Sequence, residues 1–168
     1  KAVLENKADL GIAFDGDGDR LLFIDKEGKE LDGDDLLYIL VSANQSRNNS
    51  KTYQGIVGTL MSNKSLELFL DKEGIDFSRT DVGDKYVLRE LKERNWILGG
   101  EPSGHIICLD ATTTSDALIA SLKVLEAIKD LNFDISKALL NFEKLPQEII
   151  SLKVNNPQTL IMDSSIRY

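Results

Sequence analysis

The sequence is poor in cysteine, histidine and proline, and it contains no long apolar run. Among its 168 residues there are one cysteine, Cys108, one histidine, His105, and three prolines. A single cysteine excludes an internal disulfide and is typical of a reducing compartment, so we expect a cytoplasmic location. No apolar run approaches the roughly 20 residues that span a membrane, so we expect no membrane partner.

Positive charge is also scarce. The chain has 20 Lys and Arg residues against 28 Asp and Glu residues, which gives a formal net charge of −8. This surplus of negative charge disfavours nucleic acid as a partner. Hydrophobic residues make up 42% of the chain and charged residues 29%, a balance that is typical of folded domains and argues against disorder. The length suits one ordinary domain, or one domain with pieces of its neighbours.

One stretch, Asp15-Gly-Asp-Gly-Asp-Arg20, lies between two apolar, strand-like runs. Aspartates at every second position would alternate between the two sides of a regular strand. The interleaved glycines can adopt positive φ angles, so the backbone can turn and gather the three carboxylates. Gathered negative charges need a cation, and carboxylate oxygens suit a hard ion such as Mg²⁺ or Ca²⁺. We therefore predict that Asp15, Asp17 and Asp19 are metal ligands.

Other interpretations of this stretch stay open beside the metal site. Asp-Gly is a common turn signal, so an acidic hairpin turn is one alternative. An EF-hand loop starting at Asp15 fails, because Arg20 stands where glycine is needed and Lys26 where the bidentate glutamate belongs. A phosphorylated Asp15 nucleophile is chemically feasible, since carboxylates form acyl phosphates. The third carboxylate favours the metal site over the nucleophile.

A second stretch, Gly99-Gly-Glu-Pro-Ser-Gly-His105, separates two more apolar runs, where α/β folds place ligand-binding loops. Glu101 offers an acceptor, Ser103 a hydroxyl, and His105 a group that titrates near neutral pH, a set that suits a sugar. A glycine-rich connector with an incidental histidine fits the same spacing. A third stretch, 79–86, ends a strand and opens a helix, and capping by Asp84 explains it more simply than anion binding.

Strand-like and helix-like segments alternate along the chain. Strands are expected at about 10–14, 20–25, 54–60, 75–80, 96–98, 106–109 and 148–154. Helices are expected around 36–43, 66–70, 86–91, 118–131 and 135–142, with Ser62 and Asp84 as caps for the second and third. This alternation predicts an α/β fold whose sheet is largely parallel at its centre and covered by helices. The expected core residues are Ile56, Leu60, Leu66, Phe69, Leu88, Ile106, Leu118, Leu122 and Leu125.

The two chemical stretches, in this order and about eighty residues apart, resemble the motifs of the α-D-phosphohexomutase superfamily. The intervening 58–63 and 82–87, together with 109–114, resemble the phosphoglucosamine mutases within it. The resemblance implies a piece of a four-domain enzyme with a three-layer mixed sheet covered by helices. Residues 1–32 would end the second domain, 33–142 would form the third, and 143–168 would be the linker and the start of the fourth. The remaining domains would then be partners of this chain.

The resemblance also implies roles for individual residues. Asp15, Asp17 and Asp19 would bind Mg²⁺, Arg20 and His105 would be catalytic, and Glu101, Ser103 and His105 would bind the sugar. The implied reaction is the interconversion of glucosamine 6-phosphate and glucosamine 1-phosphate through a bisphosphorylated sugar and a phosphoserine outside this chain. Such an isomerase serves amino sugar metabolism and cell wall precursor synthesis. A phosphomannomutase or phosphoglucomutase of the same superfamily, or a non-catalytic cation-binding module, are the alternatives.

Two further expectations follow from the resemblance. The isolated chain should be catalytically inactive, and its edges, 1–32 and 143–168, should be mobile or pair with a second copy as a homodimer. The sequence also departs from the family pattern, because Asp81 stands where relatives commonly carry lysine, and Ser115 and Ala117 replace glycines around Asp116. These departures put a basic substrate contact in doubt and predict a packing change at a helix start.

Overall fold

The computed structural model describes residues 1–46, 53–150 and 153, and it contains two β-sheets and their covering helices. The expected strand at 148–154 falls partly outside these residues, and its described part, 148–150 and 153, is not a strand. The elements in chain order are α1 (Ala2–Asn6), β1 (Leu10–Phe14), β2 (Leu21–Asp25), β3 (Glu30–Leu31), α2 (Gly33–Ser46), β4 (Gly55–Thr59), α3 (Lys64–Lys72), β5 (Asp76–Thr80), α4 (Asp84–Arg94), β6 (Leu98–Gly100), β7 (Ile106–Cys108), α5 (Ala117–Ile128), the 3₁₀ helix η1 (Lys129–Leu131) and α6 (Ile135–Ala138).

The first sheet is an antiparallel hairpin, β1–β2, extended by the short β3. Leu21 and Phe23 alternate with partly exposed residues along β2, as expected of a strand with one buried face. The buried side chains of β2 join the core formed by α2 and α5. The hairpin connection is the stretch 15–20, so the Asp-rich loop is held at the tip of a strand pair that is fixed to the rest of the molecule.

The second sheet has the strand order β5-β4-β6-β7. β4 pairs in parallel with both β5 and β6, and β7 closes the sheet antiparallel to β6. The parallel centre predicted from the alternating pattern is therefore confirmed. Because β4, β5 and β6 run in the same direction, the loops that follow them lie at one edge of the sheet. The loop after β6 is the stretch 101–105.

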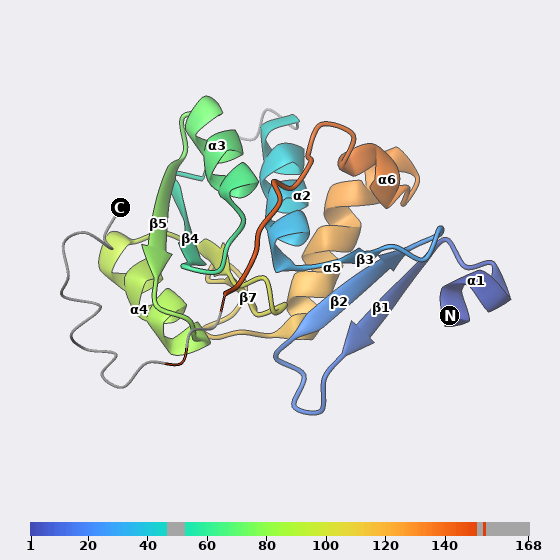
Figure 1. Ribbon diagram of the computed structural model, residues 1–168, viewed down its shortest axis with the longest axis horizontal. Coiled ribbons are helices and arrows are strands. Elements are labelled where there is room, and N and C mark those ends of the chain that lie inside the picture. Colours follow the sequence, from blue (N-terminus) through green and yellow to red (C-terminus); the bar gives the residue numbers. More distant parts are fainter. Residues whose placement is uncertain (47–52, 151–152, 154–168) are drawn as a thin grey trace.

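Helices cover both faces of this second sheet. Ile56 of β4 packs with residues of α2, α3 and α5, whereas its neighbour Val57 packs against Val87 and Leu91 of α4. Adjacent residues of a strand point to opposite faces, so the two hydrophobic clusters lie on the two sides of one sheet. Figure 1 shows α2 and α5 side by side in the middle of the molecule, between the two sheets. The expected three-layer mixed α/β architecture is confirmed.

The predicted core face of the helix at 118–131 is wrong in part. Leu118 and Leu122 are 60% and 54% exposed, whereas Ala120, Ser121 and Val124 of α5 are buried. α5 is apolar on most of its circumference, so the hydrophobic spacing does not select one face. Small residues on the buried side allow α5 to pack closely on α2.

Leu60, also expected in the core, is 63% exposed in the loop after β4. Ile56, Leu66 and Ile106 are fully buried as predicted, and Phe69, Leu88 and Leu125 are partly buried.

Two predicted helix caps also differ. Asn63 caps α3, since its side chain accepts a hydrogen bond from the Ser65 amide, and the hydroxyl of Ser62 accepts one from the Thr59 amide instead. Asp84 is the first residue of α4, whose N-cap is Gly83 with a φ of 134°. Serine, asparagine and aspartate all suit a cap, so neighbouring candidates are not distinguished by type alone.

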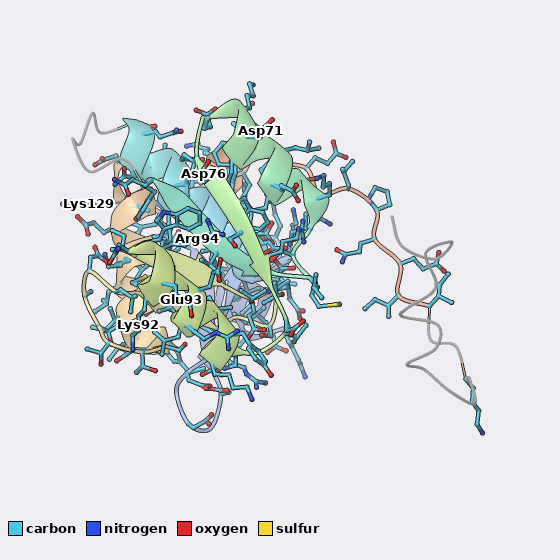
Figure 2. All side chains as sticks on the ribbon, turned by 90° about the vertical axis from the view of Figure 1, so that its left-hand side faces the viewer. Asp71, Asp76, Lys92, Glu93, Arg94 and Lys129 are labelled. Carbon is cyan, nitrogen blue, oxygen red and sulfur yellow. The ribbon has the colours of Figure 1, made fainter. Side chains whose placement is uncertain are left out.

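Strand β5 forms one edge of the second sheet, and charged side chains protect it. Arg79 donates to Glu67 of α3 and to the backbone carbonyls of Thr59 and Ser62. Figure 2 looks onto this side and shows labelled charged side chains, among them Asp71 and Asp76, along α3 and β5. Charged groups on an edge strand discourage pairing with another strand. Within the described residues, no helix is both long and apolar enough to cross a membrane.

Candidate functional site

The Asp15 side chain organises the acidic loop. Its Oδ1 atom accepts hydrogen bonds from the backbone amides of Gly18, Asp19 and Arg20 at 3.1, 3.2 and 3.2 Å. Gly18 has a φ of 73°, which lets the chain turn back toward Asp15. Burial alone would raise the pKa of Asp15, but these amides and the Asp19 side chain lower it below its ordinary value. Asp15 is therefore held as a carboxylate.

The three aspartates of this loop come together as predicted. One carboxylate oxygen from each of Asp15, Asp17 and Asp19 lies within 4.8 Å of the others. The Oδ1 atom of Asp19 is buried and has no hydrogen-bond partner among the described residues. A buried oxygen without a donor is destabilising unless a cation or water satisfies it. This oxygen and the all-carboxylate donor set fit a hard divalent cation.

The start of α5 fixes the loop from the other side. The Ala117 amide donates to the carbonyl of Gly18 at 3.0 Å, and the Ser115 hydroxyl donates to the carbonyl of Asp19 at 2.7 Å. Asp116 caps α5 by accepting from the Ile119 amide. The expected change at a helix start is therefore a direct contact with the acidic loop, a role that sequence inspection missed. The position of Ser115 beside a helix cap was the available signal.

The stretch 101–105 forms a tight turn against the acidic loop. The Glu101 amide donates to the carbonyl of His105 at 2.9 Å, and the Leu21 amide donates to the carbonyl of Gly104 at 3.2 Å. A Cβ atom at Gly104 would lie 2.2 Å from the carbonyl oxygen of Leu21, so only glycine allows this approach. The two chemical stretches therefore meet in space, as the end of β6 and the start of β2 bring them together.

His105 links these stretches through its two ring nitrogens. Its Nδ1 atom lies 2.8 Å from Oε2 of Glu101, and its Nε2 atom lies 2.9 Å from Oδ2 of Asp19. Arg20 Nε lies 3.2 Å from the same Nε2 atom. Because Nε2 carries either a proton or a lone pair, it donates to Asp19 or accepts from Arg20, but it does not do both. The tautomer of His105 therefore decides whether Nε2 bonds to Asp19 or to Arg20.

Glu101 is more enclosed than a side chain awaiting a sugar hydroxyl. The residue is 3% exposed, and its Oε1 atom accepts from the Gly83 amide at 2.8 Å while Oε2 faces His105. Gly83 lies in the stretch 79–86, whose sequence predicts a helix start and not a site residue. Ser103, by contrast, is exposed on the turn. The geometry brings Asp15, Asp17, Asp19, Arg20, Glu101 and His105 together, and the individual roles assigned to them stay predictions.

Residues 32–145 match the family model described as phosphoglucomutase/phosphomannomutase, alpha/beta/alpha domain III. The chain belongs to this family. It is 45% identical over 157 residues to a phosphoglucosamine mutase of Neisseria meningitidis serogroup C, covering 94% of this chain and 35% of that protein. It is 48% identical over 166 residues to a phosphoglucosamine mutase of Pseudomonas fluorescens, covering 99% of this chain and 37% of that protein. The chain thus spans about a third of the length of the curated relatives it matches.

Solved structures support the same assignment. A phosphoglucomutase/phosphomannomutase family protein of Burkholderia thailandensis superposes with a TM-score of 0.74 at 28% identity, covering 88% of this chain and 31% of that one. An N-acetylglucosamine-phosphate mutase in the apo form superposes with a TM-score of 0.69 at 23% identity, covering 88% and 37%, and shows the shared fold. The resemblance to the α-D-phosphohexomutase superfamily, stated from the two motifs, is confirmed.

Proposed function

We propose that this chain is the central part of a phosphoglucosamine mutase, an isomerase that interconverts glucosamine 6-phosphate and glucosamine 1-phosphate. The observation that carries the proposal is the junction of the two loops at His105, which places the carboxylate cluster beside the turn 101–105. The names of the relatives with the identities given above support the substrate. Residues 1–32 would complete a preceding domain, 33–142 would form the third domain, and 143–168 would lead into a fourth.

A divalent cation, Mg²⁺ in our proposal, would be held by Asp15, Asp17 and Asp19. The buried, unpartnered Oδ1 atom of Asp19 supports this, as does an N-acetylphosphoglucosamine mutase of Aspergillus fumigatus solved with GlcNAc-6P and magnesium. When bound, the cation would supply positive charge to neutralise a phosphoryl group in transfer. Asp15, with its lowered pKa, would contribute a ligand that stays ionised.

The other residues of the site would bind and orient the substrate. Arg20 is half exposed beside Asp15, with its Nε atom 3.8 Å from Oδ2, and would add a second positive charge for the phosphoryl group. The exposed Ser103 hydroxyl is available to a sugar hydroxyl. Glu101 would hold the Nδ1–H of His105, which leaves Nε2 as the atom that takes up or releases a proton. A phosphoserine from another part of the enzyme would donate and accept the phosphoryl group.

A second candidate function is that of a phosphomannomutase or phosphoglucomutase. The family description and the Burkholderia relative both carry these names, which supports phosphates of hexoses without an amino group as alternative substrates. A cation-binding module without catalysis is less well supported, because His105 and Arg20 would then have no reason to meet the cluster. The single, buried cysteine supports a reducing compartment such as the cytoplasm, and pairing of two copies stays a prediction.

The test uses the full-length protein that contains this chain. We expect glucosamine 1-phosphate to form from glucosamine 6-phosphate when Mg²⁺ and the 1,6-bisphosphate activator are supplied, and to form faster than the products of glucose or mannose phosphates. Faster turnover of glucose or mannose phosphate would favour the second candidate. No turnover of any hexose phosphate by a folded, serine-phosphorylated protein would refute both.

A further inference from the structure

The segment 143–147, which follows α6, is fastened to the domain although it contains no helix or strand. The backbone amide of Leu145 donates to the side chains of Asn63 and Ser65. In return, the side-chain amide of Asn63 donates to the backbone carbonyl of Leu145 at 2.8 Å. Gln147 donates to the carbonyl of Met61 at 3.1 Å. In Figure 1 the segment runs down between α3 and α2. We call residues 143–147 the strap.

Lys144 of the strap sits on the first turn of α2. Asp32 and Asp35 form a reciprocal cap there, since Oδ1 of Asp32 accepts from the Asp35 amide and Oδ2 of Asp35 accepts from the Asp32 amide. Lys144 Nζ lies 2.6 Å from each of these two carboxylates. Burial raises the pKa of Asp35, and the Lys144 charge opposes that rise. Lys144 is therefore the counter-charge of a cap in which Asp35 is buried and Asp32 is partly exposed.

The same turn of α2 supports the turn at 101–105. The Gly33 amide donates to the carbonyl of Pro102 at 3.2 Å. A Cβ atom at Gly33 would lie 1.9 Å from the carbonyl oxygen of Glu101, so the two backbones touch. The ion pair of Lys144 with Asp32 and the hydrogen bond of the next residue, Gly33, to Pro102 thus connect the strap to the turn that contains His105.

We propose that Lys144 is a positioning residue for the site, acting through Asp32 and Gly33 on the turn 101–105. The strap then belongs to the third domain, whose boundary lies after Gln147 and not at residue 142. The simpler interpretation is a surface ion pair, which contributes little. Three observations argue against that interpretation. The Asp35 side chain is only 6% exposed, and the Lys144 ammonium group contacts two carboxylates. The strap next to Lys144 is also fixed by the hydrogen bond from the Leu145 amide to Ser65.

The experiment compares Lys144→Met, Lys144→Arg and Lys26→Met in the full-length protein. Lys26 is the matched control, because it pairs with Asp134 across a similar sequence distance but sits at the end of the β1–β2 hairpin away from the acidic loop. Native-state hydrogen exchange is measured on peptides covering 101–105 and, separately, KM and kcat are measured. We expect about tenfold faster exchange at 101–105 in Lys144→Met, restoration in Lys144→Arg, and no change in Lys26→Met.

The kinetic measurement rests on the proposed function, whereas the exchange measurement does not. We expect Lys144→Met to raise KM more than it lowers kcat, since a loosened turn binds substrate less well. If Lys144→Met does not fold, Lys144→Met/Asp35→Asn, which leaves no unpaired carboxylate at position 35, carries the same test. Unchanged exchange at 101–105, or an equal change in Lys26→Met, would overturn the proposal. Inactive wild-type enzyme would count against the proposed function alone.

Discussion

Asp34 gives a prediction whose size follows from its surroundings. The residue is 1% exposed on the first turn of α2, and its Oδ2 atom accepts from the Asn63 amide at 2.6 Å. Its Oδ1 atom is buried without a partner among the described residues. Burial raises the pKa of Asp34 to about 6, against 3.8 for the free side chain, and the nearby Asp32 adds to the rise while Asn63 and Lys144 oppose it.

The sign follows from the direction of this shift. The folded chain binds the Asp34 proton more tightly than the unfolded chain does, so this group stabilises the fold fully below about pH 4 and loses that contribution as the pH rises through about 6. A difference of roughly two pKa units corresponds to about 3 kcal/mol at pH 8. Asp34→Asn replaces the acid by a neutral amide that can still accept from Asn63. We therefore expect the variant to be more stable than the wild type at pH 8, by up to about 3 kcal/mol.

The assay is urea unfolding of the 168-residue chain and of Asp34→Asn between pH 4 and pH 8. The difference in unfolding free energy between the two proteins removes the contribution of all other titrating groups. We expect this difference to grow between about pH 4 and pH 6, where the folded chain holds the Asp34 proton and the unfolded chain has lost it, and to level off above that range. A difference that stays constant across this range would refute the assignment of a raised pKa to Asp34, whatever its average size.

Four other outcomes are expected. Asp17→Ala in the full-length enzyme should lose Mg²⁺-dependent activity, and near-normal turnover with the same Mg²⁺ dependence would contradict the metal site. Glu101→Gln should raise the activation free energy of turnover by about 1–3 kcal/mol, because it disturbs the hydrogen bond to His105. The midpoint of thermal unfolding should change little, and steady-state kinetics and thermal unfolding measure the two effects. Ser103→Ala should raise KM and leave the fold intact. The isolated chain should not convert glucosamine 6-phosphate, as shown by product analysis, since the phosphoserine lies outside it; turnover would make Asp15 the suspected phosphoryl carrier.

The elements of the fold were largely predictable because their periodicity is strong. The alternation of strands and helices gave the α/β class, and the parallel pairing of β4 with its neighbours followed from it. The buried face of α5 was not predictable, because Leu118 and Leu122 continue an apolar pattern around the helix and only packing against α2 decides which side is covered.

The site was predictable in composition but not in its connections. The two motifs identify the residues, yet nothing in their spacing shows that the buried Glu101 carboxylate is shared by Gly83 and His105. The strap was not predictable either, because single side chains such as Asn63 and Lys144 fasten it and no periodic pattern marks them. Contacts between a backbone and isolated polar side chains leave no repeat in a sequence.

Cys108 can serve as a natural probe of local unfolding at β7. It lies buried in β7, the last strand of the second sheet, and burial raises the pKa of its thiol to about 12. A thiol that is both covered and protonated does not react with alkylating reagents until the strand is exposed. Because the chain has no other cysteine, no labelling site needs to be engineered. The rate of alkylation would then report how often β7 becomes exposed to solvent.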